Sequence, residues 1–71
     1  MVNTSMLKGL IESRGTNVDE VAKRMGIDKS TLYRRIADGN TFTIGEVGKI
    51  AEILSMSSAE AISIFFNQSV A

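Results

Sequence analysis

The stretch "VDEVAKRMGIDKSTLYRRI", residues 18–36, decides the expected fold. It contains two segments in which apolar residues recur at helical spacing: Val21, Ala22 and Met25, then Leu32 and Ile36. Only Gly26, Ile27 and Asp28 separate the two segments, and so short a connection does not let helices fold back antiparallel. The stretch therefore predicts two helices that cross steeply.

The three connecting residues suit a tight turn between helices. Gly26 tolerates a positive φ, Ile27 offers an apolar side chain for the corner, and Asp28 offers a cap for the next helix. Ala22 is small enough to let the helices approach closely where they cross. This is the helix-turn-helix pattern, in which the second helix, from residue 29 to about 37 or 38, is the recognition helix.

Capping signals extend the prediction along the chain. Three pairs of Asn, Thr or Ser with a following glutamate fit capping boxes: Asn17 with Glu20, Thr43 with Glu46, and Ser57 with Glu60. The expected helices cover about residues 5–14, 18–25, 29–38, 44–54 and 58–66. The predicted fold class is all-α, a compact five-helix bundle. Residues 1–71 are expected to form a single domain with a core of about residues 5–66.

Apolar stripes indicate which residues form that core. The first helix offers Met6, Leu7, Leu10 and Ile11, and the fourth offers Val47, Ile50, Ala51 and Leu54. The segment "TFTI", residues 41–44, lies directly before a capping box. We interpret it as a loop that holds Phe42 in the core.

The last helix carries more apolar surface than one face on a small core can cover. Ile62 and Phe65 are expected to fill the core. The residues that would then face outward are Ala61, Ile64 and Phe66. Because exposed apolar patches commonly mark interfaces, these three residues are the candidate protein interface. Burial against the first helix is the alternative.

Composition excludes several classes of function. The chain has 71 residues, 44% of them hydrophobic, and no cysteine or histidine. Thiolate and imidazole ligands and most catalytic constellations are therefore missing, and we expect no enzyme activity, cofactor, metal or small-molecule substrate. No signal peptide and no run of roughly 18 apolar residues is present, which predicts a cytoplasmic protein without membrane contact.

Charge is distributed unevenly although the formal net charge is zero. Residues 1–40 carry seven basic and five acidic side chains, whereas residues 41–71 carry one basic and three acidic. Lys29, Arg34 and Arg35 lie together in the predicted recognition helix, with no acid among them. A polyanionic partner would therefore meet the N-terminal half of the chain.

The run "VDEVAKRMGIDKSTLYRRIADG", residues 18–39, with "FTIGEVGKIAEIL", residues 42–54, resembles the Cro and repressor helix-turn-helix family of temperate phages and bacterial regulators. The resemblance covers about residues 5–66, and "A-x-x-x-G-I-x-x-S-T-L" is a moderately specific part of it. The loop "G-x-x-F-T-x-x-E" resembles small regulators encoded by phages of Gram-positive bacteria. The resemblance implies a lambda-repressor-like, XRE-type fold and a small Cro-like or modulator-of-repression protein in the host bacterial cytoplasm.

The resemblance also implies roles for individual residues. The residues expected to read bases from the outward face of the recognition helix are Lys29, Ser30, Tyr33 and Arg34. The residues expected to contact phosphate are Asn17, Val18, Arg35, Asn40 and Thr41. A solvated basic face, with Tyr33 as a partly exposed packing residue, is the alternative. Lys23 and Arg24 are expected to serve solubility.

Two positions depart from the family's pattern. Val18 stands where the family usually has a glutamine that anchors phosphate and braces the recognition helix. Only main-chain N–H groups would then hold a phosphate there. Arg35 stands where many members carry a large apolar residue, and Ile36 is expected to take over that packing role.

Two functions from different classes follow. The first is a sequence-specific DNA-binding regulator of a phage lysis/lysogeny switch, whose recognition helix occupies double-stranded operator DNA. One such module buries only roughly 600–1,000 Å², so a homodimer on two half-sites is expected. The alternative is an antirepressor that binds the cognate repressor protein, with or without DNA. The zero net charge, Val18 and the apolar last helix favour it.

Overall fold

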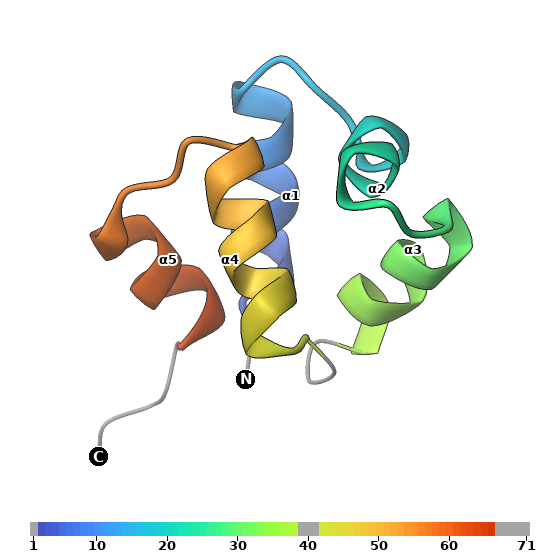
Figure 1. Ribbon diagram of the computed structural model, residues 1–71. Helices are drawn as coiled ribbons and strands as arrows, with labels where there is room; N and C mark the ends of the chain where they lie inside the picture. Colours follow the sequence, from blue (N-terminus) through green and yellow to red (C-terminus); the bar gives the residue numbers. More distant parts are fainter. Residues whose placement is uncertain (1, 39–41, 67–71) are drawn as a thin grey trace.

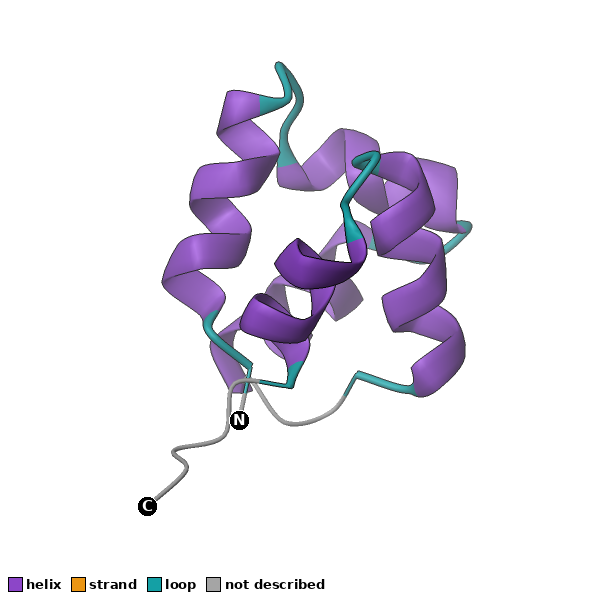
Figure 2. Cartoon of the chain, turned by 90° about the vertical axis from the view of Figure 1, so that its left-hand side faces the viewer, coloured by secondary structure: helices purple, strands orange, loops and turns teal. Residues whose placement is uncertain are grey.

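The structure is a computed structural model that describes residues 2–38 and 42–66. The described residues form five helices: α1 (Thr4–Ser13), α2 (Val18–Met25), α3 (Lys29–Asp38), α4 (Ile44–Ile53) and α5 (Ser58–Phe65). In Figure 1, α2 and α3 lie on one side of α1 and α4, and α5 lies on the opposite side. Figure 2 shows only helices and loops in the described ranges. The all-α, five-helix prediction is confirmed.

Complete capping boxes begin the last two helices. The Thr43 hydroxyl accepts from the N–H of Glu46 at 3.1 Å, and the Glu46 carboxylate accepts from the N–H of Thr43 at 2.9 Å. Ser57 and Glu60 repeat the same two bonds at 3.1 and 2.9 Å. Each box satisfies two backbone donors that the first helical turn leaves without a partner. Both predicted boxes are confirmed.

The first two helices are capped by asparagine alone. Asn17 Oδ1 accepts from the N–H of Glu20 at 2.9 Å, but the Glu20 carboxylate accepts from Arg24 Nε at 3.4 Å. The predicted box at α2 is therefore only half formed. Asn3 Oδ1 accepts from the N–H of Met6 at 3.1 Å, which places the start of α1 at Thr4.

Every helix contributes buried apolar side chains to one core. They are Leu7, Ile11, Val21, Ala22, Met25, Leu32, Ile36, Ile50, Leu54, Ile64 and Phe65. Phe42 packs against them with its ring edge-on to Phe65, the centroids 5.6 Å apart at 76°. The expected burial of Phe42 is confirmed. The expected burial of Met6 is wrong, because the inward stripe of α1 passes through Leu7 and Ile11 and leaves Met6 46% exposed.

The orientation predicted for α5 is also wrong. Ile64 was expected to face outward, but it is only 2% exposed, whereas Ile62, expected in the core, is 59% exposed. The Ile64 carbonyl accepts from the N–H of Asn3, which holds this end of α5 against the start of α1. Ile64 and Phe65 therefore form the inward face, and Ile62 and Phe66 lie one turn apart on the outward face.

Candidate nucleic-acid interface

The turn between α2 and α3 has the geometry that its sequence predicts. Gly26 has φ 77° and ψ 26°, a left-handed conformation that favours glycine, and its N–H continues the bonding of α2. The N–H of Ile27 donates to the carbonyl of Ala22 at 3.1 Å, and Ala22 is 1% exposed. Asp28 Oδ1 lies 3.4 Å from the N–H of Ser30, at the start of α3. These contacts fix α3 across the end of α2.

All four predicted base-reading residues lie on the exposed surface of α3. Lys29 and Ser30 occupy its first turn, and Tyr33 and Arg34 follow one turn later. Leu32 and Ile36, on the opposite face, are almost completely buried. Burial of that stripe therefore sets the rotation of α3 and presents the predicted reading residues outward.

Two of these four residues share one carboxylate on α2. The Tyr33 hydroxyl donates to Asp19 Oδ1 at 3.2 Å, and Lys29 Nζ lies 3.8 Å from Asp19 Oδ2. The hydrogen bond to Asp19, and then the negative charge of that carboxylate, raise the pKa of Tyr33 above its usual value of 10.0. Asp19 thus links the start of α2 to the outward face of α3.

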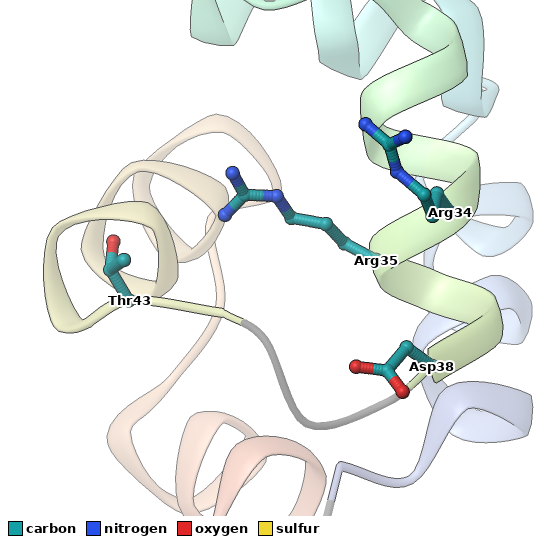
Figure 3. A pocket seen from close by; sticks show the side chains of 4 residues that line it. All are labelled: Arg34, Arg35, Asp38 and Thr43. Carbon is teal, nitrogen blue, oxygen red and sulfur yellow. The ribbon is translucent and has the colours of Figure 1, made fainter.

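Arg35 lies against α4 and apart from the outward face. Its guanidinium forms an ion pair with Glu46, with the two side chains 27% and 17% exposed. Figure 3 shows Arg35 reaching from α3 toward the start of α4, where Thr43 lies. Since Glu46 also completes the capping box of α4, this ion pair joins α3 to the α4 cap.

Arg34 is the remaining member of the basic trio. Within residues 2–38 and 42–66 its guanidinium has no ion-pair partner, unlike the Lys29 ammonium and the Arg35 guanidinium. It lines an open hollow of about 580 Å³ together with Arg35, Asp38 and Thr43 (Figure 3). A guanidinium carries five N–H donors, so Arg34 offers a full set of donors to an incoming acceptor.

The predicted phosphate ligands are only partly described. Asn17 is the N-cap of α2, and Val18 is half-buried at its first position. Both line a second hollow, of about 310 Å³, which also borders Tyr33. Asn40 and Thr41 fall outside the described residues.

The predicted protein interface is present only in part. Phe66 is 54% exposed and Ala61 is half-buried, whereas Ile64 belongs to the core. Ile62 takes the exposed position expected for Ile64. In Figure 1, α5 and α3 lie at opposite sides of the molecule, so this apolar patch is remote from the basic face.

Sequence reasoning missed the partners of the basic residues. The sequence pattern predicts no role for Asp19 and places Glu46 only in the capping box of α4, yet these two residues pair with Lys29 and Arg35. Each contact joins residues from different helices. Helical spacing within one segment carries no signal for such a pair.

Two further classes of feature are missing from the described ranges. No group of three or more Asp and Glu side chains there is arranged to hold a metal ion. No helix there is long and apolar enough to span a bilayer.

Comparison with known protein families gives one finding. The model of a helix-turn-helix family matches residues 7–62, which is more than half of the chain and includes both α2 and α3. Comparisons with curated proteins and with solved structures found no match.

Proposed function

The chain belongs to the XRE-type, lambda-repressor- and Cro-like helix-turn-helix family of DNA-binding transcription regulators, and we propose that it reads operator DNA with α3. The observation that carries this proposal is the exposed Arg34, a guanidinium without an ion-pair partner among the described residues, on the outward face of the second helix. This family is not normally enzymatic.

Each residue of the outward face has a chemical role in this proposal. Arg34 donates two hydrogen bonds to the O6 and N7 acceptors of a guanine, and Lys29 donates to a neighbouring acceptor. Ser30 bonds either a donor or an acceptor on a base edge, and the ring of Tyr33 packs on a thymine methyl group. Together they occupy one stretch of the major groove.

Phosphate contacts would flank this reading face. We assign Asn17 and Val18 to one side, through the main-chain N–H groups at the start of α2. Asn40 and Thr41, which follow α3 in the sequence, are proposed for the same role. Arg35 keeps this proposed role, but because its guanidinium is paired with Glu46 we expect it to contribute less to phosphate binding than Arg34.

A homodimer would supply the second half-site. We propose that Phe66 and Ile62, with Ala61 beside them, form the contact between subunits. Because α5 lies opposite α3, this contact would leave the recognition helix open to DNA (Figure 1).

The test begins with selection of a binding site from random duplexes by the wild-type protein. Arg34→Ala should then bind the selected site about 1–3 kcal/mol more weakly than the wild type does. On duplexes altered at the base pair that Arg34 reads, the two proteins should bind with nearly equal affinity. Lys49→Ala, an exposed basic residue on α4 that lines neither hollow, is the control and should bind like the wild type. A uniform loss on all duplexes would assign Arg34 to phosphate, and failure of the wild type to select any site would refute the proposal.

An antirepressor is the second candidate, and one observation favours it. Asp19 and Glu46 pair with two of the three basic residues of α3, which lowers the positive charge that this face offers to phosphate. The exposed Ile62 and Phe66 would then contact the cognate repressor protein. Affinity capture of that repressor by wild type but not by Ile62→Glu, without DNA binding by the protein alone, would support this function.

The biological setting that we propose is a phage lysis/lysogeny switch. The resemblance of the loop before α4 to small phage regulators supports it. A divergently transcribed repressor gene, with operator repeats in the intervening DNA that this protein selects, is the expected genomic arrangement. Binding only to sites elsewhere would contradict this setting without affecting the role of α3.

A further inference from the structure

Asp19 occupies an unusual position for an acidic residue in a protein that binds DNA. It is the second residue of α2, and its side chain is 55% exposed beside the first two turns of α3. Both of its carboxylate oxygens are directed to residues of the proposed reading face, one to Tyr33 and one to Lys29. Asp19 therefore places a negative charge next to the proposed reading face, in contact with two of its residues.

The two contacts restrict the positions of the Lys29 ammonium and the Tyr33 hydroxyl. The Lys29 ammonium is drawn toward the start of α2, and the Tyr33 hydroxyl proton is donated to a carboxylate. A phosphate that approached the Lys29 ammonium would be repelled by the charge of Asp19, and one that accepted from the Tyr33 hydroxyl would also have to replace Asp19. Asp19 therefore makes phosphate binding by Lys29 and Tyr33 less favourable in free energy.

Reading bases does not require the same exchange. The ammonium of Lys29 has three donors, so it can keep its ion pair while it donates to a base. The ring of Tyr33 can pack on a thymine methyl while its hydroxyl stays on Asp19. Base reading is compatible with both Asp19 contacts, whereas phosphate binding by Lys29 is opposed by the charge of Asp19 and phosphate binding by the Tyr33 hydroxyl loses its contact with Asp19. Specificity is this difference between the two affinities.

We propose that Asp19 is a specificity-determining residue whose carboxylate withholds Lys29 and Tyr33 from phosphates and so suppresses binding to non-operator DNA. This inference rests on the proposed function of α3. It assigns to Asp19 a role in selecting among DNA sequences, without a contact of its own to a base.

Glu20 supplies a matched control because it is the next residue on the same turn of α2. Its carboxylate accepts from Arg24 on its own helix and contacts neither Lys29 nor Tyr33. Asp19→Asn and Glu20→Gln each remove one negative charge from the start of α2, where the helix dipole acts on both. Only Asp19→Asn releases residues of the reading face.

The experiment measures binding of each variant to a duplex of mixed sequence and to the site selected by the wild type, over a range of salt. For Asp19→Asn we expect non-operator affinity to rise about fivefold, the effect of one unit charge at contact distance in water. Its slope of log affinity against log salt should steepen by about 0.9, the value for one added phosphate contact. Operator affinity should rise less, so the ratio of the two affinities narrows.

A second variant shows whether Lys29 causes the change. Adding Lys29→Met to Asp19→Asn should remove the extra salt dependence, because the released ammonium is then missing. If Asp19→Asn matches Glu20→Gln in affinity and salt slope, the inference is wrong while operator reading by α3 stands. If neither wild type nor Asp19→Asn binds any duplex, the proposed function is wrong as well.

Tyr33 gives an independent readout in the absence of DNA. It is the only tyrosine and the chain has no tryptophan, so an ultraviolet titration of the phenol reports on this residue alone. Asp19→Asn should lower the Tyr33 pKa toward its usual value, and Glu20→Gln should not. An unchanged pKa in Asp19→Asn would show that the contact with Asp19 does not form in solution and would overturn the inference.

Discussion

Arg14 donates two hydrogen bonds from Nη2 to the carboxylate of Glu60, at 3.0 and 3.1 Å, although the two residues are 46 positions apart in the sequence. The same guanidinium donates from Nε to the carbonyl of Leu54 at 3.0 Å. Arg14 is the C-cap of α1, Leu54 is the C-cap of α4, and Glu60 belongs to the first turn of α5. One side chain therefore joins three helix ends.

Replacing Arg14 should destabilise the fold through that junction. Arg14→Met keeps much of the aliphatic side chain but leaves the part-buried Leu54 carbonyl without its donor, which should cost about 1 kcal/mol in the free energy of unfolding. Arg24→Met removes an exposed pair within α2 and should stay within about 0.5 kcal/mol of the wild type. Urea unfolding of both variants gives the comparison, and equal stability would contradict a role for the junction.

The protein should lose stability at acidic pH, in part because Glu60 becomes protonated. The hydrogen bond from the Ser57 N–H, and then the one from Arg14, lower the pKa of Glu60 below its usual value of 4.5. A lowered pKa means that the ionised form stabilises the folded state above pH 4.5 and that this contribution is lost as pH falls through the lower, folded-state value.

The variant Glu60→Gln tests this directly. It should be less stable than the wild type at neutral pH, and the two thermal unfolding midpoints should converge as pH falls below 4.5. Glu52→Gln, on the exposed face of α4, is the control and should follow the wild type across the range. A constant difference between Glu60→Gln and wild type at every pH would show that ionisation of Glu60 is not involved.

The turn of the helix-turn-helix should tolerate substitution at Gly26 poorly. A Cβ there meets no atom within 4 Å, so the cost of Gly26→Ala comes from the backbone conformation at φ 77°. We expect a loss of about 1–2 kcal/mol. Gly48→Ala, in open space within α4, should instead raise stability by about 0.5–1 kcal/mol. In urea unfolding, the free energy of unfolding should therefore fall for Gly26→Ala and rise for Gly48→Ala.

The two isoleucines of α5 should differ sharply in their effect on stability. Ile64→Ala opens a cavity at a residue 2% exposed and should cost about 2–5 kcal/mol. Ile62→Ala, at a residue 59% exposed, should change monomer stability by less than about 0.5 kcal/mol. Differential scanning calorimetry at low protein concentration measures both. Similar losses would mean that α5 is rotated from the orientation described above.

Local signals predicted most of the helices. Gly26 and Asp28 mark the two ends of a turn, because glycine favours its backbone conformation and aspartate caps the next helix. Thr43 and Ser57 begin helices through hydrogen bonds to residues three positions later. Such contacts can be inferred from spacing alone. The start of α1 differed by one residue because Asn3 caps it without the glutamate that marks a capping box.

Contacts between helices could not be predicted in the same way. In α5 nearly every face is apolar, so its pattern does not distinguish Ile62 from Ile64, and packing against α1 decides which one is buried. The candidate site shows the same limit. The sequence correctly predicts that the four proposed reading residues lie on the exposed face of α3, but the pairing of Lys29 with Asp19 depends on how α2 and α3 cross.

The edge-on contact between Phe42 and Phe65 joins α5 to the loop that precedes α4. Phe42 directly precedes the Thr43 cap, and its ring packs on Phe65 of α5. The start of α4, where Glu46 pairs with Arg35 of α3, is therefore supported by a residue of α5. A partner that shifted α5 would disturb that support and the orientation of Arg35 with it. The two opposite sides of the molecule are in this way mechanically connected through a pair of aromatic rings.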